Sequence, residues 1–315
     1  MVPLLRQIRF PNLLIIALTF YSYRYFILEP FYHQSGEQIW TSSFDYAIMV
    51  ITTMLIAAAG YLVNDYCDID IDRVNCPDRP SVSGSIKPGS LFTGAVLLSI
   101  LALIGILLLS SRMQSLIPLI VLITALITVW AYAFWLKKSL FLGNLSVAFM
   151  SSLTLGMAWL FEWINSGRPS YNLTVSGMIP WTTTGIIVFA FLLTLMREIV
   201  KDMEDLEGDS KFGCRTLPIA MGIPFSTRML WILALFTMLL LIPAQVYLWK
   251  TGFIITALWL VPMIQLPQLI FIYSLTNSGN KSDYHKLSHW IKWTMVGGIS
   301  SIIVIGLTVS LNHSN

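Results

Sequence analysis

Five aspartates lie within fourteen positions of the segment "YLVNDYCDIDIDRVNCPDRP", residues 61–80. Three of them, Asp65, Asp68 and Asp72, have offsets of 0, 3 and 7, which places their carboxylates on one face of a helix. Asn64 joins the same face. Such a face is suited to binding a hard divalent cation, because Mg²⁺ prefers carboxylate oxygens and commonly bridges them to phosphate groups.

A second acidic segment, "REIVKDMEDLEGDSKFGCRTLP", repeats this spacing. Asp202, Asp205 and Asp209 have the same offsets as the first three aspartates. Both clusters directly follow an apolar stretch, and both are followed by basic residues and a proline, so we interpret them as a weak internal repeat. The acids that point away from these faces, and that we expect to be solvated or paired, are Asp70, Glu204 and Glu207.

Stacked carboxylates at the end of a membrane helix repel one another and oppose the helix dipole, which indicates a compensating cation. Two such faces could hold metal ions with a diphosphate between them. Nearby basic side chains could neutralise the phosphate oxygens, and we expect only one of the adjacent Lys137 and Lys138 to touch phosphate. The basic residues are Arg73, Arg79, Lys137, Lys138, Lys201, Lys211 and Arg215.

The elements that must position these residues are membrane helices. Of the 315 residues 56% are hydrophobic and 11% charged, and the mean hydropathy is +0.73. Apolar runs long enough to span a bilayer predict an all-α, polytopic membrane protein with about nine transmembrane helices around a central cavity, and we expect residues 1–315 to form a single domain. The expected spans are 10–28, 45–63, 91–110, 115–136, 143–162, 179–197, 229–249, 252–274 and 291–311.

The positive charges divide unevenly between the two sides of this arrangement. All but four of the 19 lysines and arginines fall on the side of the acidic segments, and the exceptions are Arg24, Arg112, Arg168 and Lys250. The positive-inside rule then places that side in the cytoplasm of a multi-pass protein of the cell membrane. Disulfides are not expected there for the three cysteines.

The first motif resembles that of a known family. "NDYCDIDID", with Asn64, Asp65, Asp68 and Asp72, is similar to the NDxxDxxxD motif of the UbiA superfamily of intramembrane prenyltransferases, and it continues into a similar "N-x-P-x-R-P" (Asn75 to Pro80). "DLEGD", from Asp205 to Asp209, resembles the family's second motif, DxxxD. Two further segments are similar to the family: "RFPNLLI", with Arg9 and Asn12, and "YAFWLKKSLFLGN", with Tyr132, Lys137 and Asn144.

The resemblance implies a Mg²⁺-dependent transferase that moves a prenyl group from a polyprenyl diphosphate to a lipid-soluble acceptor in the membrane. Loss of diphosphate would leave an allylic carbocation for the acceptor to capture. It implies Asn64, Asp65, Asp68, Asp72, Asp202, Asp205 and Asp209 as metal ligands. Of these, the catalytic residues would be Asp68, Asp72, Asp205 and Asp209. The side chains expected on the diphosphate are Arg79, Lys137, Lys201, Lys211, Tyr132 and Asn144.

The acceptor is left open by the sequence. "REIVKDMEDLEGD" looks most like the branch that uses geranylgeranylglyceryl phosphate, and the alternative is an aromatic or quinone precursor of the hydroxybenzoate, homogentisate or naphthoate type. A cation transporter is the alternative from another class, but it would carry its acids within the spans, which are almost free of them. We expect membrane lipid around the protein and no nucleic-acid partner.

Several residues have ordinary as well as functional interpretations. The acidic faces could be solvated loop surfaces. His285 and His289, four residues apart, could form a transition-metal pair but are more often simply polar groups near a membrane surface. Tyr61, Tyr66 and Tyr132 are the aromatic residues whose positions near the acidic segments suggest contact with a carbocation.

Overall fold

The structure, a computed structural model, describes residues 2–34, 36, 38–165 and 178–313, and every regular element in these ranges is a helix. The expected all-α membrane fold is confirmed. The longer helices are α2 (Phe10–Tyr23), α4 (Ser43–Cys67), α6 (Pro88–Arg112), α7 (Ile117–Phe134), α8 (Leu142–Asn165), α10 (Met178–Glu204), α13 (Ile223–Lys250), α15 (Leu266–Thr276) and α16 (Lys281–His313). The short ones are α1 (Val2–Gln7), η1 (Arg24–Leu28), α3 (Glu29–Gln34), α5 (Ile69–Asn75), η2 (Leu136–Lys138), α11 (Leu206–Lys211), α12 (Leu217–Met221), α14 (Ile254–Leu260) and η3 (Val261–Gln265).

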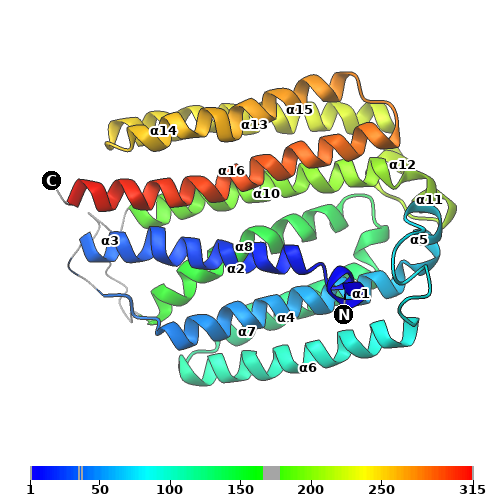
Figure 1. The fold of residues 1–315 in the computed structure, drawn as a ribbon, viewed down its shortest axis with the longest axis horizontal. Coiled ribbons are helices and arrows are strands. Elements are labelled where there is room, and N and C mark those ends of the chain that lie inside the picture. The colour runs from blue at the N-terminus through cyan, green and yellow to red at the C-terminus, as the bar shows by residue number, and fades with distance from the viewer. Residues whose placement is uncertain (1, 35, 37, 166–177, 314–315) are drawn as a thin grey trace.

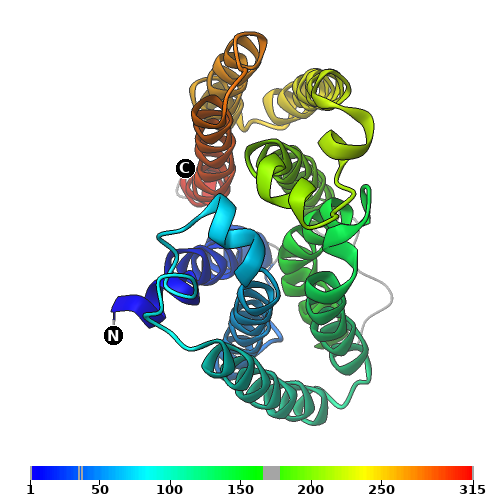
Figure 2. The ribbon, with the colours of Figure 1, turned by 90° about the vertical axis from the view of Figure 1, so that its right-hand side faces the viewer.

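The long helices lie side by side along one direction (Figure 1), and seen from one end they form a ring (Figure 2). Within the described residues, eight helical segments are long and apolar enough to cross a membrane. They correspond to eight of the nine expected spans, although the last begins at Lys281, ten residues earlier than predicted. The first expected span, 10–28, is built from α2 and the π-helical η1 and runs on into α3, so it is helical over its whole length. It is not among the eight, and it is less apolar than they are because Asn12, Arg24 and several tyrosines interrupt its apolar residues.

The outward faces of the bundle are apolar. In each of α6, α7 and α13, only 22% of the apolar 18-residue stretch that could span the membrane is buried within the protein. Large side chains such as Leu97, Ile104 and Ile232 are at least half exposed. Lipid is the environment in which such faces are stable, so these helices line the outside of the bundle.

Two π-helical segments, η1 and η3, pack against α16. At each contact α16 has a glycine: a Cβ on Gly306 would meet the backbone of Phe26, and one on Gly297 would meet the backbone of Met263. The neighbouring Gly298 has open space around its Cα. The last helix therefore depends on two specific glycines to approach the irregular parts of its neighbours.

The acidic segments come together at one end of the bundle. Helices α5, α11 and α12 lie at the right of Figure 1 and in front of the ring in Figure 2. The opposite end carries the ion pair between Asp45, in the first turn of α4, and Arg112, at the end of α6. Arg168, expected at that end, lies outside the described residues.

Candidate active site

The two acidic motifs have the same local backbone. Helix α4 ends at Cys67 and α5 begins at Ile69, with Asp68 between them at φ −95° and ψ 1°. Helix α10 ends at Glu204 and α11 begins at Leu206, with Asp205 between them at φ −93° and ψ 5°. In each half of the chain a membrane helix thus breaks at the middle aspartate and continues as a short helix. The structure supports the internal repeat inferred from the spacing.

The carboxylates of the first motif are buried. Asp65, Asp68 and Asp72 are 2%, 3% and 5% exposed, and Asp209 of the second motif is 3% exposed. These side chains are therefore not solvated loop faces. By contrast, Asp70 forms an exposed ion pair with Arg73, as expected for an acid on the other face.

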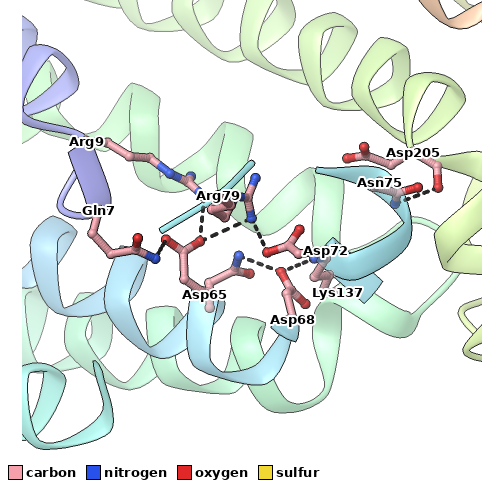
Figure 3. Close-up of polar contacts among 10 residues, drawn as sticks. Gln7, Arg9, Asp65, Asp68, Asp72, Asn75, Arg79, Lys137 and Asp205 are labelled. Carbon is pink, nitrogen blue, oxygen red and sulfur yellow. Dashed lines mark hydrogen bonds and ion pairs between the residues drawn. The ribbon is translucent and has the colours of Figure 1, made fainter. Parts of the chain in front are cut away.

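Basic and amide side chains hold the first motif (Figure 3). Arg79 forms ion pairs with Asp72 and with Asp65, the latter at 3.4 Å. Asp65 also accepts hydrogen bonds from Arg9 at 3.0 Å and from Gln7 at 2.7 Å. Asp65 thus fixes the N-terminal segment and the 76–80 loop against α4.

Lys137 enters the site from the segment between α7 and α8. It forms an ion pair with Asp68, which also accepts a hydrogen bond from Asn64 at 2.7 Å. The adjacent Lys138 is exposed. Lys137 is therefore the member of the pair that lies at the acidic cluster.

The second motif is held by fewer side chains. Asn144 of α8 donates a hydrogen bond to Asp202 at 2.8 Å. The backbone oxygen of Asp209 accepts from the N–H of Cys214 at 3.0 Å. Lys211 is exposed and pairs with Glu207 at 2.7 Å, so it does not join the cluster. Lys201 and Tyr132 are partly buried.

The two motifs are in direct contact. The side chain of Asn75, at the end of α5, donates to the backbone oxygen of Asp205 at 3.0 Å and accepts from the N–H of Gly208 at 2.9 Å. The loop after α11 also reaches the basic segment, since the N–H of Arg215 donates to the backbone oxygen of Lys138 at 3.0 Å. The acids of both halves therefore share one end of the bundle.

Burial changes the protonation of the outer pair of aspartates. It raises the pKa of Asp72 to about 6, against the opposing charge of Arg79. It likewise raises the pKa of Asp209 to about 6, against that of Lys137. For Lys137 burial acts to lower the pKa, but the charge and hydrogen bond of Asp68, together with the charges of Asp209 and Asp72, outweigh it and the pKa is raised. At both aspartates the effect of burial on the pKa exceeds that of the neighbouring cation.

The donor atoms suit a hard cation. In the described part of the chain no three acidic, cysteine or histidine side chains converge as a ready metal site. In the first motif, Arg79 and Lys137 pair with the carboxylates instead. However, Asn64 Oδ1 and Asp209 Oδ1 are buried and have no hydrogen-bond partner. Unpartnered buried oxygens are costly, and oxygen is the ligand type that Mg²⁺ prefers, so these residues fit the ion.

A pocket of about 450 Å³ opens beside Asp65 and Arg79. Its lining contains three arginines and two aspartates, which makes it suited to an anionic, hydrogen-bonding ligand. The lining residues are Arg6, Gln7, Arg9, Asp65, Asn75, Cys76, Pro77, Asp78, Arg79 and Pro80.

The three tyrosines selected from the sequence have different surroundings. The guanidinium of Arg9 lies 4.7 Å from the ring centre of Tyr61. Tyr66 is 38% exposed and packs against Phe92, on the outward side of α4. Tyr132 is partly buried near the end of α7, five positions before Lys137.

The histidine pair lies on α16 and contacts Glu204. Nε2 of His289 is 3.2 Å from Nε2 of His285, and Nδ1 of His285 is 2.9 Å from Oε1 of Glu204. Both histidines are exposed. Glu204, which the sequence analysis assigned to the outer face, is accordingly paired there.

Sequence reasoning assigned no role to several residues that hold the site. Gln7 and Arg9 bind Asp65 although they are 58 and 56 positions away. Asn75 belonged to the recognised "N-x-P-x-R-P" segment, but nothing in the pattern indicated that it would bridge the motifs. Glu198 is buried in α10 one turn before Asp202, and its four-residue spacing from that aspartate was the available signal.

The fold and the paired acidic motifs define a class: membrane-embedded helical enzymes whose site can hold a diphosphate. A sequence profile of the UbiA prenyltransferase family matches residues 31–291, and the chain belongs to this family. It is an integral membrane prenyltransferase.

Individual relatives agree with this assignment. The digeranylgeranylglyceryl phosphate synthase of Methanosphaera stadtmanae is 30% identical over 260 residues, which cover 81% of this chain and 86% of that protein. The synthase of the same name from Methanothermobacter thermautotrophicus is 32% identical over 235 residues, 74% of each chain.

Solved structures have the same fold. A structure of digeranylgeranylglyceryl phosphate synthase is similar with a TM-score of 0.59 and 25% identity, covering 96% of this chain and 98% of that one. A UbiA homolog from Archaeoglobus fulgidus, solved with GPP and Mg²⁺, has a TM-score of 0.56 at 17% identity and covers 95% of this chain and 99% of that one. At that identity the second likeness concerns the fold alone.

Proposed function

We propose that this prenyltransferase transfers a geranylgeranyl group from geranylgeranyl diphosphate to geranylgeranylglyceryl phosphate. The observation that carries the diphosphate chemistry is the contact between the two acidic motifs through Asn75. The choice of acceptor is supported by the relatives of 30% and 32% identity, whose name states a product with two geranylgeranyl groups on glyceryl phosphate. The whole chain would form one membrane domain.

The residues that would hold Mg²⁺ come from both motifs. They are Asn64, Asp65, Asp68 and Asp72 from the first, and Asp202, Asp205 and Asp209 from the second. The unpartnered oxygens of Asn64 and Asp209 support this assignment. When bound, Mg²⁺ would supply positive charge to the diphosphate oxygens and so favour departure of the diphosphate.

The basic residues would bind the diphosphate itself. Arg79 and Lys137 are paired with carboxylates, and they would exchange these partners for phosphate oxygens. Asn144 would act through Asp202, to which it is hydrogen-bonded. Lys201, Lys211 and Tyr132 remain proposed contacts, and Lys211 would have to leave Glu207 to reach the ligand.

In the proposed reaction the bond between the allylic carbon and the diphosphate oxygen breaks, and its electron pair leaves with the diphosphate. The acceptor hydroxyl oxygen forms the new carbon–oxygen bond and loses its proton to the diphosphate. The protein binds the leaving group, orients the acceptor and excludes water from the cationic carbon. Of the tyrosines considered, Tyr132 has the surroundings best suited to contact that carbon.

The active site would face the cytoplasm. The excess of lysine and arginine at the end of the bundle that carries the acidic motifs supports this orientation. A cysteine placed at Arg73, which is exposed in α5, would test it by labelling with a membrane-impermeant thiol reagent in intact and in opened cells, in a background without the native cysteines.

The function is tested by incubating purified protein with geranylgeranyl diphosphate, Mg²⁺ and a panel of acceptors. We expect digeranylgeranylglyceryl phosphate as the product with geranylgeranylglyceryl phosphate. Prenylation of hydroxybenzoate, homogentisate or naphthoate instead would overturn the proposed acceptor but keep the diphosphate chemistry. No transfer to any acceptor by folded protein would reject both.

A further inference from the structure

Asn75 lies between the two acidic motifs and binds both ends of a single turn. Its Nδ2 donates to the backbone oxygen of Asp205 at 3.0 Å (Figure 3). Its Oδ1 accepts from the N–H of Gly208 at 2.9 Å. The side chain belongs to a residue that is only 6% exposed. Both the NH₂ and the C=O of its side-chain amide therefore join α5 to the start of α11.

Gly208 makes this contact possible. A Cβ at Gly208 would lie 2.5 Å from Nδ2 of Asn75, closer than real Cβ atoms approach other atoms. A larger residue at position 208 would therefore displace the Asn75 side chain and break its hydrogen bonds to Asp205 and Gly208. The glycine is what allows the Asn75 amide to lie directly against α11.

A third element holds Asn75 from its other side. Nζ of Lys281, the first residue of α16, donates to the backbone oxygen of Asn75 at 2.7 Å. This oxygen is one of the carbonyls left without a partner at the end of a helix. The end of α5 is thereby fixed to two other helices.

The short helices need such support. Helix α5 has seven residues and α11 has six, and helices of this length are not stable by themselves in water. Each follows a break at an aspartate and carries the last aspartate of its motif, Asp72 or Asp209. The direction of both carboxylates consequently depends on contacts from outside the helices.

We propose that Asn75 is a positioning residue that fixes the separation of the two acidic motifs, so that both bind one metal–diphosphate group. The inference rests on the proposed function for its ligand, but not for its geometry. Asn75 itself need not touch the substrate. It acts through the backbone of Asp205 and Gly208.

The first test measures binding. The half-saturating concentration of geranylgeranyl diphosphate, with Mg²⁺, is determined from the rise in Tm of purified protein and by calorimetry. For Asn75→Ala we expect an increase of at least about tenfold, as for other residues that orient metal ligands. Gly208→Ala should give a similar increase, and the double variant should be no worse than either, because both remove the same contact.

Two further variants serve as a substitute for Asn75→Ala and as a control. Asn75→Asp keeps the size of the side chain and can still accept from the N–H of Gly208, but it cannot donate to Asp205. It replaces the alanine variant if that variant fails to fold. We expect it, too, to raise the half-saturating concentration of the diphosphate. Asn277→Ala makes the same substitution at an exposed helix end elsewhere and should bind like the wild type. Wild-type affinity in folded Asn75→Ala and Asn75→Asp would overturn the proposal.

The second test needs no substrate. Spin labels at Arg73 and Glu207, both exposed and on α5 and α11, report the distance between the helices in a background without the native cysteines. We expect a narrow distribution that broadens in Asn75→Ala, and an unchanged distribution would overturn the proposal. If the wild type does not bind the diphosphate, the proposed function fails, whereas this measurement still decides the role of Asn75.

Discussion

Lys137 and Asp68 form an ion pair across 69 positions of the sequence, between the segment after α7 and the break that follows α4. The pair connects the basic segment of the bundle end to the first acidic motif. Since Asp68 is 3% exposed, Lys137 neutralises a buried carboxylate and the pair is not a surface ion pair.

Replacing Lys137 tests which of the two adjacent lysines binds diphosphate. We expect Lys137→Met to lower kcat/KM for the prenyl diphosphate by about 10- to 100-fold, the loss typical of a charge-assisted contact in a buried site. Lys138→Met is the matched control, because Lys138 is exposed. Equal effects of the two substitutions would contradict the assignment.

The middle aspartates of the motifs should be essential for transfer. We expect Asp68→Ala and Asp205→Ala each to abolish Mg²⁺-dependent prenyl transfer while membrane insertion is retained, since each removes a proposed metal ligand at a helix break. Asp70→Ala serves as the control, because that carboxylate is exposed and paired with Arg73. Product formation is measured with a labelled prenyl diphosphate. Full activity of Asp68→Ala or Asp205→Ala would contradict the proposed metal site.

The raised pKa values of Asp72 and Asp209, both about 6, predict a pH dependence. An acid whose pKa is higher in the folded than in the unfolded protein binds its proton more tightly when folded. Between about pH 4 and 6 the unfolded chain therefore loses these protons first, and the metal-free protein becomes less stable as the pH rises. Above that window both carboxylates are charged and available to Mg²⁺.

We accordingly expect Mg²⁺ with prenyl diphosphate to raise Tm much more at about pH 7.5 than at about pH 5.5. Thermal unfolding in detergent at the two pH values measures this. Asp209→Asn, which has no titrating group at that position, should show a smaller difference between them. Equal ligand-induced shifts at both pH values in the wild type would show that these carboxyls do not limit binding.

Two neighbouring glycines of α16, Gly297 and Gly298, should differ in how much their replacement by alanine changes stability. Gly297→Ala would place a Cβ against the backbone of Met263, and we expect it to lower the free energy of unfolding by roughly 1–3 kcal/mol, as overpacking does. Gly298→Ala has open space and should be neutral or slightly stabilising, since alanine is the better helix former. The two Tm values in detergent give the comparison. A similar loss in both would mean that helix flexibility, and not the close contact, decides stability.

The acidic motifs and most membrane helices could be predicted because their signals are local. The offsets of Asp65, Asp68 and Asp72 fix one helix face, and long apolar runs identify spans. The first span, 10–28, coincides with α2 and η1, but the π-helical form of Arg24–Leu28 leaves no mark in hydropathy and could not be predicted. The hydrogen bond from Gln7 to Asp65 joins residues 58 positions apart, and only the assembled fold determines such a contact.

Because α16 contributes Lys281 to the end of α5 and packs on η1 and η3, this helix completes contacts with segments that are synthesised before it. Until α16 has been inserted into the bilayer, the end of α5 therefore lacks one of its supports. A ribosome stalled before residue 281 would leave a chain that is anchored in the membrane but whose acidic end is incomplete, so the reactive site is finished only after α16 has been made.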